Sequence, residues 1–399
     1  MEPLKAGHDL SNNIPNGMRM SGKARILQIE IEKAVFGGLF LGRHEGKAVL
    51  VPNAVPGETV TVRILSEKKD YCTGEIENVI SGPGDRVIPA CPLYNRCGGC
   101  SYLHVPYKKE LEFKKNVLMD SLARIAGLDP DSIPGPVVIH EDRFHYRSHA
   151  SIKARGGVSG FFRRGTNDIV PIAETGCLLL DNAVNERLMH IDAPPDDYRA
   201  AVDCSGAVVT SFDGDPLVRE REAELSFSRG IDQFFQANRF LRSALLEHVV
   251  SLARCDKADT FLDIGCGVGF FTLPLARVSK HGHGIDINAE SIRFARMNAA
   301  ENGITNVDFE ARHSSRLHPG RLEPRVMVMD PPRAGIDRHT RKTILVMGPR
   351  VIVYVSCNPS TFARDVKDFI AVGYRLETLM LADMFPCTQH VEVISRLTR

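Results

Sequence analysis

The chain has almost no excess of charge and no hydrophobic run long enough to cross a membrane. Its 399 residues include 50 Lys and Arg against 49 Asp and Glu, so only a local basic patch could hold a polyanionic partner. No segment approaches the roughly 20 apolar residues of a membrane helix, and no apolar signal-peptide core follows the first residues. We therefore expect a cytosolic protein whose ten cysteines are free thiols or metal ligands rather than disulfides.

The length predicts two or three domains, and the first part of the chain differs from the rest. Residues 1–21 contain few large apolar side chains, so we expect a mobile tail. From residue 24 to 79, short runs alternate apolar with polar residues between Gly and Pro turns. This pattern predicts a five-stranded β-barrel, which we assign to residues 22–80. Small barrels often bind oligonucleotides, but a scaffold or a dimer contact is an equally weighted interpretation.

The next segment contains a dense group of cysteines. Cys91, Cys97 and Cys100 lie within ten residues in the sequence CPLYNRCGGC. Three thiols at this spacing, with glycines that let the backbone wrap, favour a soft metal centre that needs a fourth ligand. Cys177, in a Glu-Thr-Gly-Cys turn, is the best candidate for that ligand. Zinc and a 4Fe–4S cluster both fit the spacing, and unpaired structural cysteines are the simpler alternative.

Residues 81–235 are predicted to form a central, mainly β domain with a surface helix at 105–127. No Asp or Glu lies between Arg143 and Arg164, where six basic residues alternate with aromatic ones. Such a strand pair offers charge for phosphates and rings for stacking on single-stranded RNA. A solvated positive face is an equally weighted alternative. The candidate RNA contacts are Arg147, Arg163 and Arg164.

After the sequence FFQAN at 234–238, strands alternate with helices, which predicts a parallel, doubly wound sheet over residues 236–399. The first strand ends in the glycine loop DIGCGVG, and the second strand ends at Asp286. This arrangement resembles both a dinucleotide loop and the loop of S-adenosylmethionine (SAM) methyltransferases. The G-x-G-x-G spacing and the preceding Asp263 favour SAM over an NAD-dependent oxidoreductase, which remains the alternative.

Two later strand ends carry residues suited to covalent chemistry. The fourth strand ends in Asp330-Pro-Pro-Arg333, where amino-methylating enzymes have an aromatic residue instead of arginine. Cys357 follows a β-branched strand and precedes Asn358-Pro359, the expected first residues of a helix whose amino end would lower the thiol pKa. A buried structural cysteine is the alternative to a nucleophile. Glu392 lies among apolar residues of the last strand. An acid in such surroundings more often has a function or an ion-pair partner than neither.

Together these motifs resemble those of the SAM-dependent RNA uracil-C5-methyltransferases, a family that makes 5-methyluridine in 23S rRNA and in the tRNA T-loop. The resemblance covers nearly the whole chain. Residues 22–80 are similar to the TRAM domain, and FFQAN, DPPRAG, SCNPSTFARD and FPCTQHVEVI are similar to the family's motifs. The implied fold is a Rossmann-like α/β methyltransferase domain that follows a TRAM barrel and a central iron–sulfur, RNA-binding domain.

The resemblance also implies a role for each candidate residue. Cys357 would attack carbon 6 of uracil, and Glu392 would remove the proton from carbon 5. The residues that would contact SAM are Gln236, Gly265, Asp286 and Asp330, and those that would hold a 4Fe–4S cluster are Cys91, Cys97, Cys100 and Cys177. We expect a monomer that acts on 23S rRNA rather than tRNA. A non-catalytic RNA-binding or RNA-folding protein on the same scaffold is the remaining alternative.

Overall fold

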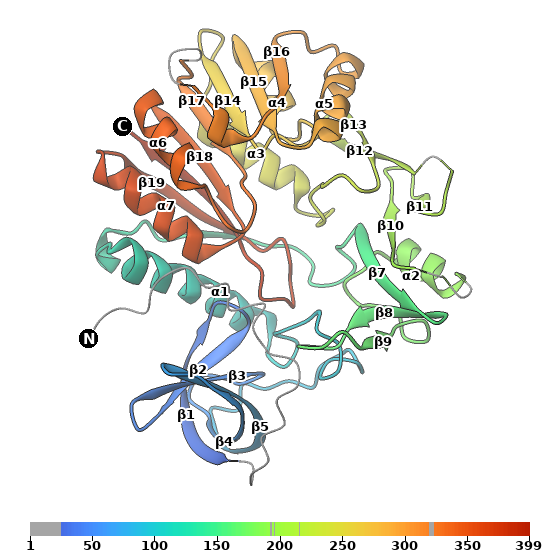
Figure 1. The fold of residues 1–399 in the computed structure, drawn as a ribbon, viewed down its shortest axis with the longest axis vertical. Coiled ribbons are helices and arrows are strands. Elements are labelled where there is room, and N and C mark those ends of the chain that lie inside the picture. Colours follow the sequence, from blue (N-terminus) through green and yellow to red (C-terminus); the bar gives the residue numbers. More distant parts are fainter. Residues whose placement is uncertain (1–24, 192–193, 195, 215, 319–322) are drawn as a thin grey trace.

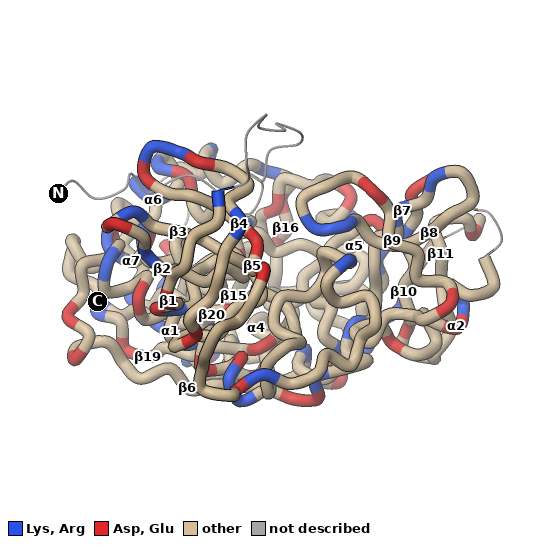
Figure 2. Tube along the Cα trace, turned by 90° about the horizontal axis from the view of Figure 1, so that it is seen from below, with Lys and Arg blue, Asp and Glu red and all other residues tan. Residues whose placement is uncertain are grey.

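A computed structural model describes residues 25–191, 194, 196–214, 216–318 and 323–399. The predicted tail at 1–21 lies outside these residues. The chain forms a barrel at one end, a central β region and a large sheet flanked by helices (Figure 1). None of the helices in the described ranges is long and apolar enough to span a membrane. Basic and acidic residues are interspersed along the chain in the view of Figure 2, as the balanced composition requires.

The amino-terminal strands close into a barrel in the order β1-β2-β3-β5-β4, as predicted. Alternate residues of β1 are buried, since successive side chains of a strand point to opposite faces. The strands are β1 (Ile26–Val35), β2 (Leu39–His44), β3 (Lys47–Pro52), β4 (Thr59–Glu67) and β5 (Tyr71–Ser81).

The predicted surface helix is α1 (Tyr107–Ser121), which continues into a π-helical turn at Leu122–Ala126. It lies between the barrel and the large sheet (Figure 1). Phe113 belongs to the barrel core, whereas Leu118 belongs to the core beneath the carboxy-terminal helices. Helix α1 is therefore more than a surface helix: its buried side links two parts of the molecule, and its other side is exposed.

The described part of the central region contains a five-stranded sheet, a two-stranded ribbon and, besides α1, one α-helix. Within the five-stranded sheet, a hairpin pairs Gly160 with Pro171. The sheet follows the order β11-β10-β7-β8-β9. Its elements are β7 (His149–Arg155), β8 (Val158–Phe162), β9 (Ile169–Pro171), α2 (Asn182–Met189), β10 (Tyr198–Val202) and β11 (Val208–Thr210), and the ribbon is β12 (Leu217–Glu222) with β13 (Leu225–Gly230).

The carboxy-terminal part is an eight-stranded sheet in the order β16-β15-β14-β17-β18-β20-β19-β6. The first five strands in this order are parallel, but β20 is antiparallel to both its neighbours, so the prediction of a wholly parallel sheet is wrong. The loop 383–391 returns the chain directly from β19, without a crossover helix. The strands are β6 (Val137–Ile139), β14 (Thr260–Ile264), β15 (His281–Asp286), β16 (Val307–Ala311), β17 (Val326–Met329), β18 (Val351–Ser356), β19 (Arg375–Ala382) and β20 (Glu392–Thr398).

Helices cover both faces of this sheet, which explains why β18 is buried throughout. Val351, Val353 and Val355 face one core, and Ile352 and Tyr354 face the other. The first core contains residues of α3 (Arg242–Ala253), α4 (Thr272–Val278) and α5 (Ala289–Glu301), and the second contains residues of α6 (Arg338–Met347) and α7 (Pro359–Ala371). The sequence analysis did not predict α6.

Candidate active site

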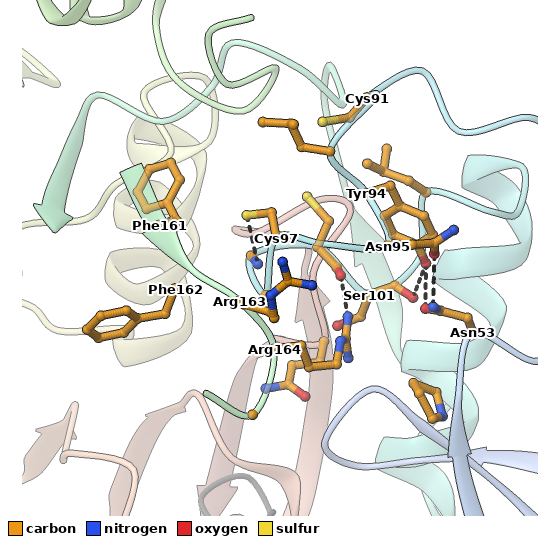
Figure 3. Close-up of a pocket in the computed structure, with 18 of the residues that line it drawn as sticks. Asn53, Cys91, Tyr94, Asn95, Cys97, Ser101, Phe161, Phe162, Arg163 and Arg164 are labelled. Atoms are coloured by element: carbon orange, nitrogen blue, oxygen red, sulfur yellow. Dashed lines mark hydrogen bonds between the residues drawn. The ribbon is translucent and has the colours of Figure 1, made fainter. Parts of the chain in front are cut away.

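The four predicted cluster cysteines line one cavity of about 1180 Å³ between the barrel and the central sheet. Its wall also contains the three predicted RNA contacts and the rings of Phe161 and Phe162 (Figure 3). The cysteine segment packs directly on this basic strand pair: Gly98 N–H donates to Phe162 O (2.9 Å), and the Arg164 guanidinium donates to Cys100 O (2.6 Å).

Within the described part of the chain, no group of three or more His, Cys, Asp or Glu side chains is arranged to hold a metal ion. The structure thus brings the four cysteines to one cavity without showing a metal-binding geometry. The Cys97 sulfur accepts a hydrogen bond from Gly99 N–H (3.4 Å), a contact that also suits a ligating thiolate. Strand β5 of the barrel also lines this cavity, with Glu75 and Glu77, a contact that was not predicted from the sequence.

The glycine loop follows β14 at the carboxyl edge of the large sheet, where ligands bind in open parallel sheets. Gly265 has a φ of +81°, and a Cβ atom there would lie only 2.7 Å from Asp330 O. Glycine is therefore required both by the backbone conformation and by the close approach of the neighbouring strand end.

Three carboxylates surround this loop. Asp263 accepts a hydrogen bond from the Thr272 hydroxyl (2.5 Å), Asp286 accepts one from Gly267 N–H (3.0 Å), and the Gln236 amide donates to Asp330 (3.4 Å). Burial, reinforced by the neighbouring carboxylates, raises the pKa values of Asp263 and Asp330 to about 7. No described Lys, Arg or His forms an ion pair with the three acids. The loop is thus suited to a ligand that brings its own positive charge.

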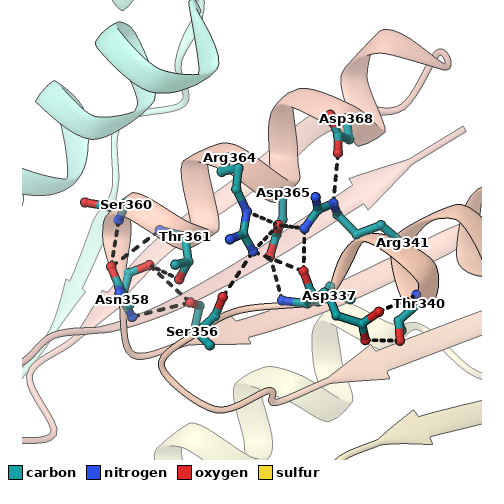
Figure 4. A network of polar contacts seen from close by, with 12 residues as sticks. Asp337, Thr340, Arg341, Ser356, Asn358, Ser360, Thr361, Arg364, Asp365 and Asp368 are labelled. Atoms are coloured by element: carbon teal, nitrogen blue, oxygen red, sulfur yellow. Dashed lines mark hydrogen bonds and ion pairs between the residues drawn. The ribbon is translucent and has the colours of Figure 1, made fainter. Parts of the chain in front are cut away.

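Cys357 lies where the sequence predicts, between the end of β18 and the start of α7. Asn358 caps the helix, because its side chain accepts hydrogen bonds from Ser360 N–H (3.0 Å) and Thr361 N–H (3.4 Å) (Figure 4). The expected lowering of the thiol pKa is wrong. Burial and then Glu392 and Asp330 raise the pKa of Cys357 to about 12, and together they outweigh Arg333 and a backbone hydrogen bond, which lower it.

Glu392 is the first residue of β20 and is only 4% exposed. The register that pairs Ser356 with Val393 brings the next residues, Cys357 and Glu392, to the same edge of the sheet. Burial and then Asp330 raise the pKa of Glu392 well above its ordinary value. Among the described residues, no group donates a hydrogen bond to Glu392 Oε1. The structure therefore brings together a thiol and an acid that are 35 residues apart in sequence.

Arg333 lies beside this pair, with its guanidinium 3.1 Å and 3.2 Å from the two ring nitrogens of His390. Burial and Arg333 lower the pKa of His390 to about 3, so the ring is neutral at physiological pH. The carbonyl of Arg333 accepts hydrogen bonds from the side chains of Asn358 (3.0 Å) and Thr361 (3.2 Å). The strand-end loop is thus tied to the start of α7.

A buried carboxylate, Asp365 of α7, stabilises the loop that follows β17 (Figure 4). It accepts hydrogen bonds from Ile336 N–H (2.9 Å) and the Tyr354 hydroxyl (2.8 Å), and it pairs with Arg341 and Arg364. Asp365 was not predicted from the sequence, although an acid on the apolar side of a strongly amphipathic helix is a usable signal.

Comparison with known proteins identifies the class. Residues 217–399 match the model of the tRNA (uracil-5-)-methyltransferase family, and residues 21–76 match the TRAM domain. An uncharacterized RNA methyltransferase of Aquifex aeolicus is 33% identical, over 94% of this chain and 99% of that protein. A second uncharacterized RNA methyltransferase, from Listeria innocua, is 28% identical over 94% and 98% of the two chains.

A solved structure has the same fold. The tRNA (uracil-54, C5)-methyltransferase of Pyrococcus abyssi, crystallised with S-adenosyl-L-homocysteine, matches 93% of this chain and 100% of its own, with a TM-score of 0.72 and 24% identity. Fold and relatives define an RNA methyltransferase with an amino-terminal TRAM barrel. The chain belongs to the RNA (uracil-5-)-methyltransferase family, which confirms the predicted family and the predicted class of SAM-dependent enzyme.

Proposed function

We propose that this enzyme methylates carbon 5 of one uridine in a structured RNA through a covalent bond between Cys357 and carbon 6. The observation that carries the proposal is the position of Cys357 next to Glu392 at the carboxyl edge of the sheet, beside Arg333 and Asp330. A non-catalytic RNA-binding protein would have no need for a buried acid without a hydrogen-bond donor beside a buried thiol.

The glycine loop supports SAM as the methyl donor. The unpaired carboxylates fit a cation, and Gly265 leaves room that a Cβ atom would fill. The residues that would hold SAM are Gln236, Gly265, Asp286 and Asp330. When bound, SAM supplies an electrophilic methyl group at its sulfonium centre.

The protein's own residues make carbon 5 reactive and then release the product. Carbon 5 of uracil is a weak nucleophile. The Cys357 thiol therefore first gives up its proton to solvent, its sulfur adds to carbon 6, and the ring becomes an enolate with electron density at carbon 5. After carbon 5 has gained the methyl group, Glu392 takes the remaining carbon 5 proton. The electrons of that C–H bond form the C5–C6 double bond and expel the thiolate. The raised pKa of Glu392 makes it a stronger base for this step.

We also propose that Cys91, Cys97, Cys100 and Cys177 hold a 4Fe–4S cluster, with zinc as the second candidate. Their shared cavity, the flexible Gly98-Gly99 turn and the N–H donated to the Cys97 sulfur support a soft metal centre. Such a centre would join segments on both sides of the basic strands and contribute folding energy. Iron and sulfide analysis of protein purified without oxygen tests this: roughly four irons per chain are expected, and one zinc without iron would exclude the cluster.

For the substrate we favour 23S rRNA, because the cysteine motif accompanies a TRAM barrel, and we keep tRNA as the second candidate. The cavity between the barrel and the central sheet supports RNA binding through Arg147, Arg163 and Arg164, which line it. The target nucleotide would have to leave its stack to reach Cys357. Mapping 5-methyluridine in RNA from cells with and without this gene tests the proposal. A missing methyl group in 23S rRNA supports the first candidate, one in tRNA supports the second, and no change in either contradicts both.

A further inference from the structure

The loop 383–391, which leads into Glu392, is held by a helix from outside the methyltransferase domain. Helix α1 inserts the side chain of Lys114, only 1% exposed, beneath this loop. The Lys114 ammonium donates to Asp383 (2.6 Å), to Glu110 (2.7 Å) and to the Phe385 carbonyl (3.1 Å). All three of its N–H donors are therefore used, and two of the three acceptors belong to the loop.

Glu110 and Tyr107 of the same helix complete the contact. Glu110 accepts a hydrogen bond from Cys387 N–H (2.6 Å) in the loop and another from Arg143 (2.9 Å). The Tyr107 hydroxyl donates to the second oxygen of Asp383 (2.8 Å). Glu110 and Asp383 are completely buried, so these bonds are shielded from water and depend on one another.

The loop adopts a conformation that needs this support. Cys387 has a φ of +69°, which is unfavourable for a residue with a side chain. Its carbonyl accepts hydrogen bonds from Ser101 N–H (2.8 Å) and Tyr102 N–H (3.1 Å), and the Tyr146 hydroxyl donates to Pro386 O (3.0 Å). The loop is therefore fixed by three sets of contacts, and all of these contacts come from residues outside the methyltransferase sheet.

Glu392 depends on this loop for its own position. No described residue donates a hydrogen bond to Glu392 Oε1, so its carboxylate is aimed by the backbone and not by a side-chain partner. We propose that Lys114, Glu110 and Tyr107 are positioning residues. They fix the loop 383–391 and thereby orient the Glu392 carboxylate toward carbon 5 of the covalent intermediate. This inference rests on the proposed role of Glu392 as the base.

The step at which Glu392 acts allows a specific test. A positioning defect at Glu392 slows only the release of the methylated adduct, whereas a general structural defect slows every step. Lys114→Met keeps an unbranched side chain that is one atom shorter and removes its three donors. A displacement of reacting groups by about 1 Å typically costs ~10²-fold, and we expect turnover to fall by that order. The first methyl transfer per enzyme should stay near the wild-type rate, and the covalent protein–RNA adduct should accumulate on a denaturing gel.

The matched control is Lys115→Met, on the same helix but exposed to solvent, which should behave like the wild-type enzyme. Glu392→Gln is the reference for a trapped adduct. If Glu392→Gln traps none, the proposed function fails. If Glu392→Gln traps adduct but Lys114→Met slows methyl transfer and turnover equally without adduct, the positioning role is wrong.

If Lys114→Met does not fold, Tyr107→Phe tests the positioning role instead. This variant removes one hydrogen bond to Asp383 and leaves all the charges paired. We expect a several-fold longer adduct lifetime with an unchanged first methyl transfer. An adduct lifetime equal to that of the wild-type enzyme would overturn the proposal.

Discussion

Two groups of carboxylates in this molecule differ in whether a cation faces them. Glu110 and Asp383, beneath the loop that leads to Glu392, both pair with Lys114. Asp263, Asp286 and Asp330, at the glycine loop, form no ion pair with a described basic residue. A buried charge without a partner is costly, so a protein keeps one only where a ligand or a reaction needs it. The paired group holds the backbone in place, and the unpaired group is prepared for a cationic ligand.

Breaking the paired group should have the largest effect on stability. Removal of one partner from a buried ion pair typically costs 3–5 kcal/mol, because the remaining charges are left uncompensated. We therefore expect Lys114→Met to lower the free energy of unfolding by about 3–5 kcal/mol in urea denaturation. Lys115→Met, at the exposed neighbouring position, should change it by no more than about 0.5 kcal/mol. Equal effects of the two substitutions would contradict the structural role of the pair.

Neutralising the unpaired group should have the opposite effect on the free protein. Asp330→Asn removes a carboxylate whose ionisation is unfavourable at this site, so the melting temperature of the ligand-free protein should not fall. SAM should bind about 1.5–3 kcal/mol more weakly, the usual value of a hydrogen bond to a charged group. Calorimetric titration and thermal unfolding measure the two quantities. A variant that is less stable but binds SAM normally would show that Asp330 stabilises the fold and does not bind SAM.

The same group predicts how pH acts on stability and binding. The pKa values of Asp263 and Asp330 are raised from 3.8 to about 7, so the folded protein holds more protons than the unfolded chain between those values. Stability of the ligand-free protein should therefore fall as pH rises from about 4 to about 7. SAM affinity should rise over pH 6–8, by up to about 1.4 kcal/mol per acid that must ionise. Binding measured at pH 6, 7 and 8 checks this, and a pH-independent affinity would contradict it.

The three candidate RNA contacts should show the smallest effect on the fold. Replacing exposed Arg163 by Gln should change the unfolding free energy by no more than about 0.5 kcal/mol. Arg147 and Arg164 are half-buried and each donates to a backbone carbonyl, so their replacement by Gln should cost about 0.5–1.5 kcal/mol each. All three substitutions should leave SAM affinity unchanged. RNA binding should weaken, and its salt dependence should decrease by about 0.7 in log–log slope for each lost contact to single-stranded RNA. If SAM affinity falls together with RNA affinity, these residues belong to the fold rather than to an RNA surface.

Local features of the sequence predicted a large part of this structure. Alternation and turn residues predicted the barrel, glycine spacing predicted the loop at Gly265, and Asn358-Pro359 predicted the start of α7. Each of these features depends on residues that are neighbours in the sequence. The resemblance to family motifs extended the prediction from structure to the roles of Cys357 and Glu392, which remain proposals.

The features that the sequence did not predict depend on contacts between distant segments. The direction of β20 is set by a loop that returns without a helix, which apolar patterning does not reveal. The raised pKa of Cys357 arises from burial and from Glu392 and Asp330, which lie far from it in the sequence. Lys114 looks like any lysine of a surface helix, and only its packing against Asp383 makes it a buried ion-pair partner.

The roles of Cys357 and Glu392 can be tested together by the covalent adduct that Glu392→Gln forms with substrate RNA. Glutamine keeps the size of the side chain but cannot accept the carbon 5 proton, and loss of a general base costs ~10²–10⁴-fold. With SAM present, we predict a slow-migrating protein–RNA band that contains methylated uridine, formed in about one turnover at the wild-type rate. The double variant Cys357→Ala with Glu392→Gln should form no band. Normal turnover by Glu392→Gln, or a band that persists without Cys357, would contradict the proposed mechanism.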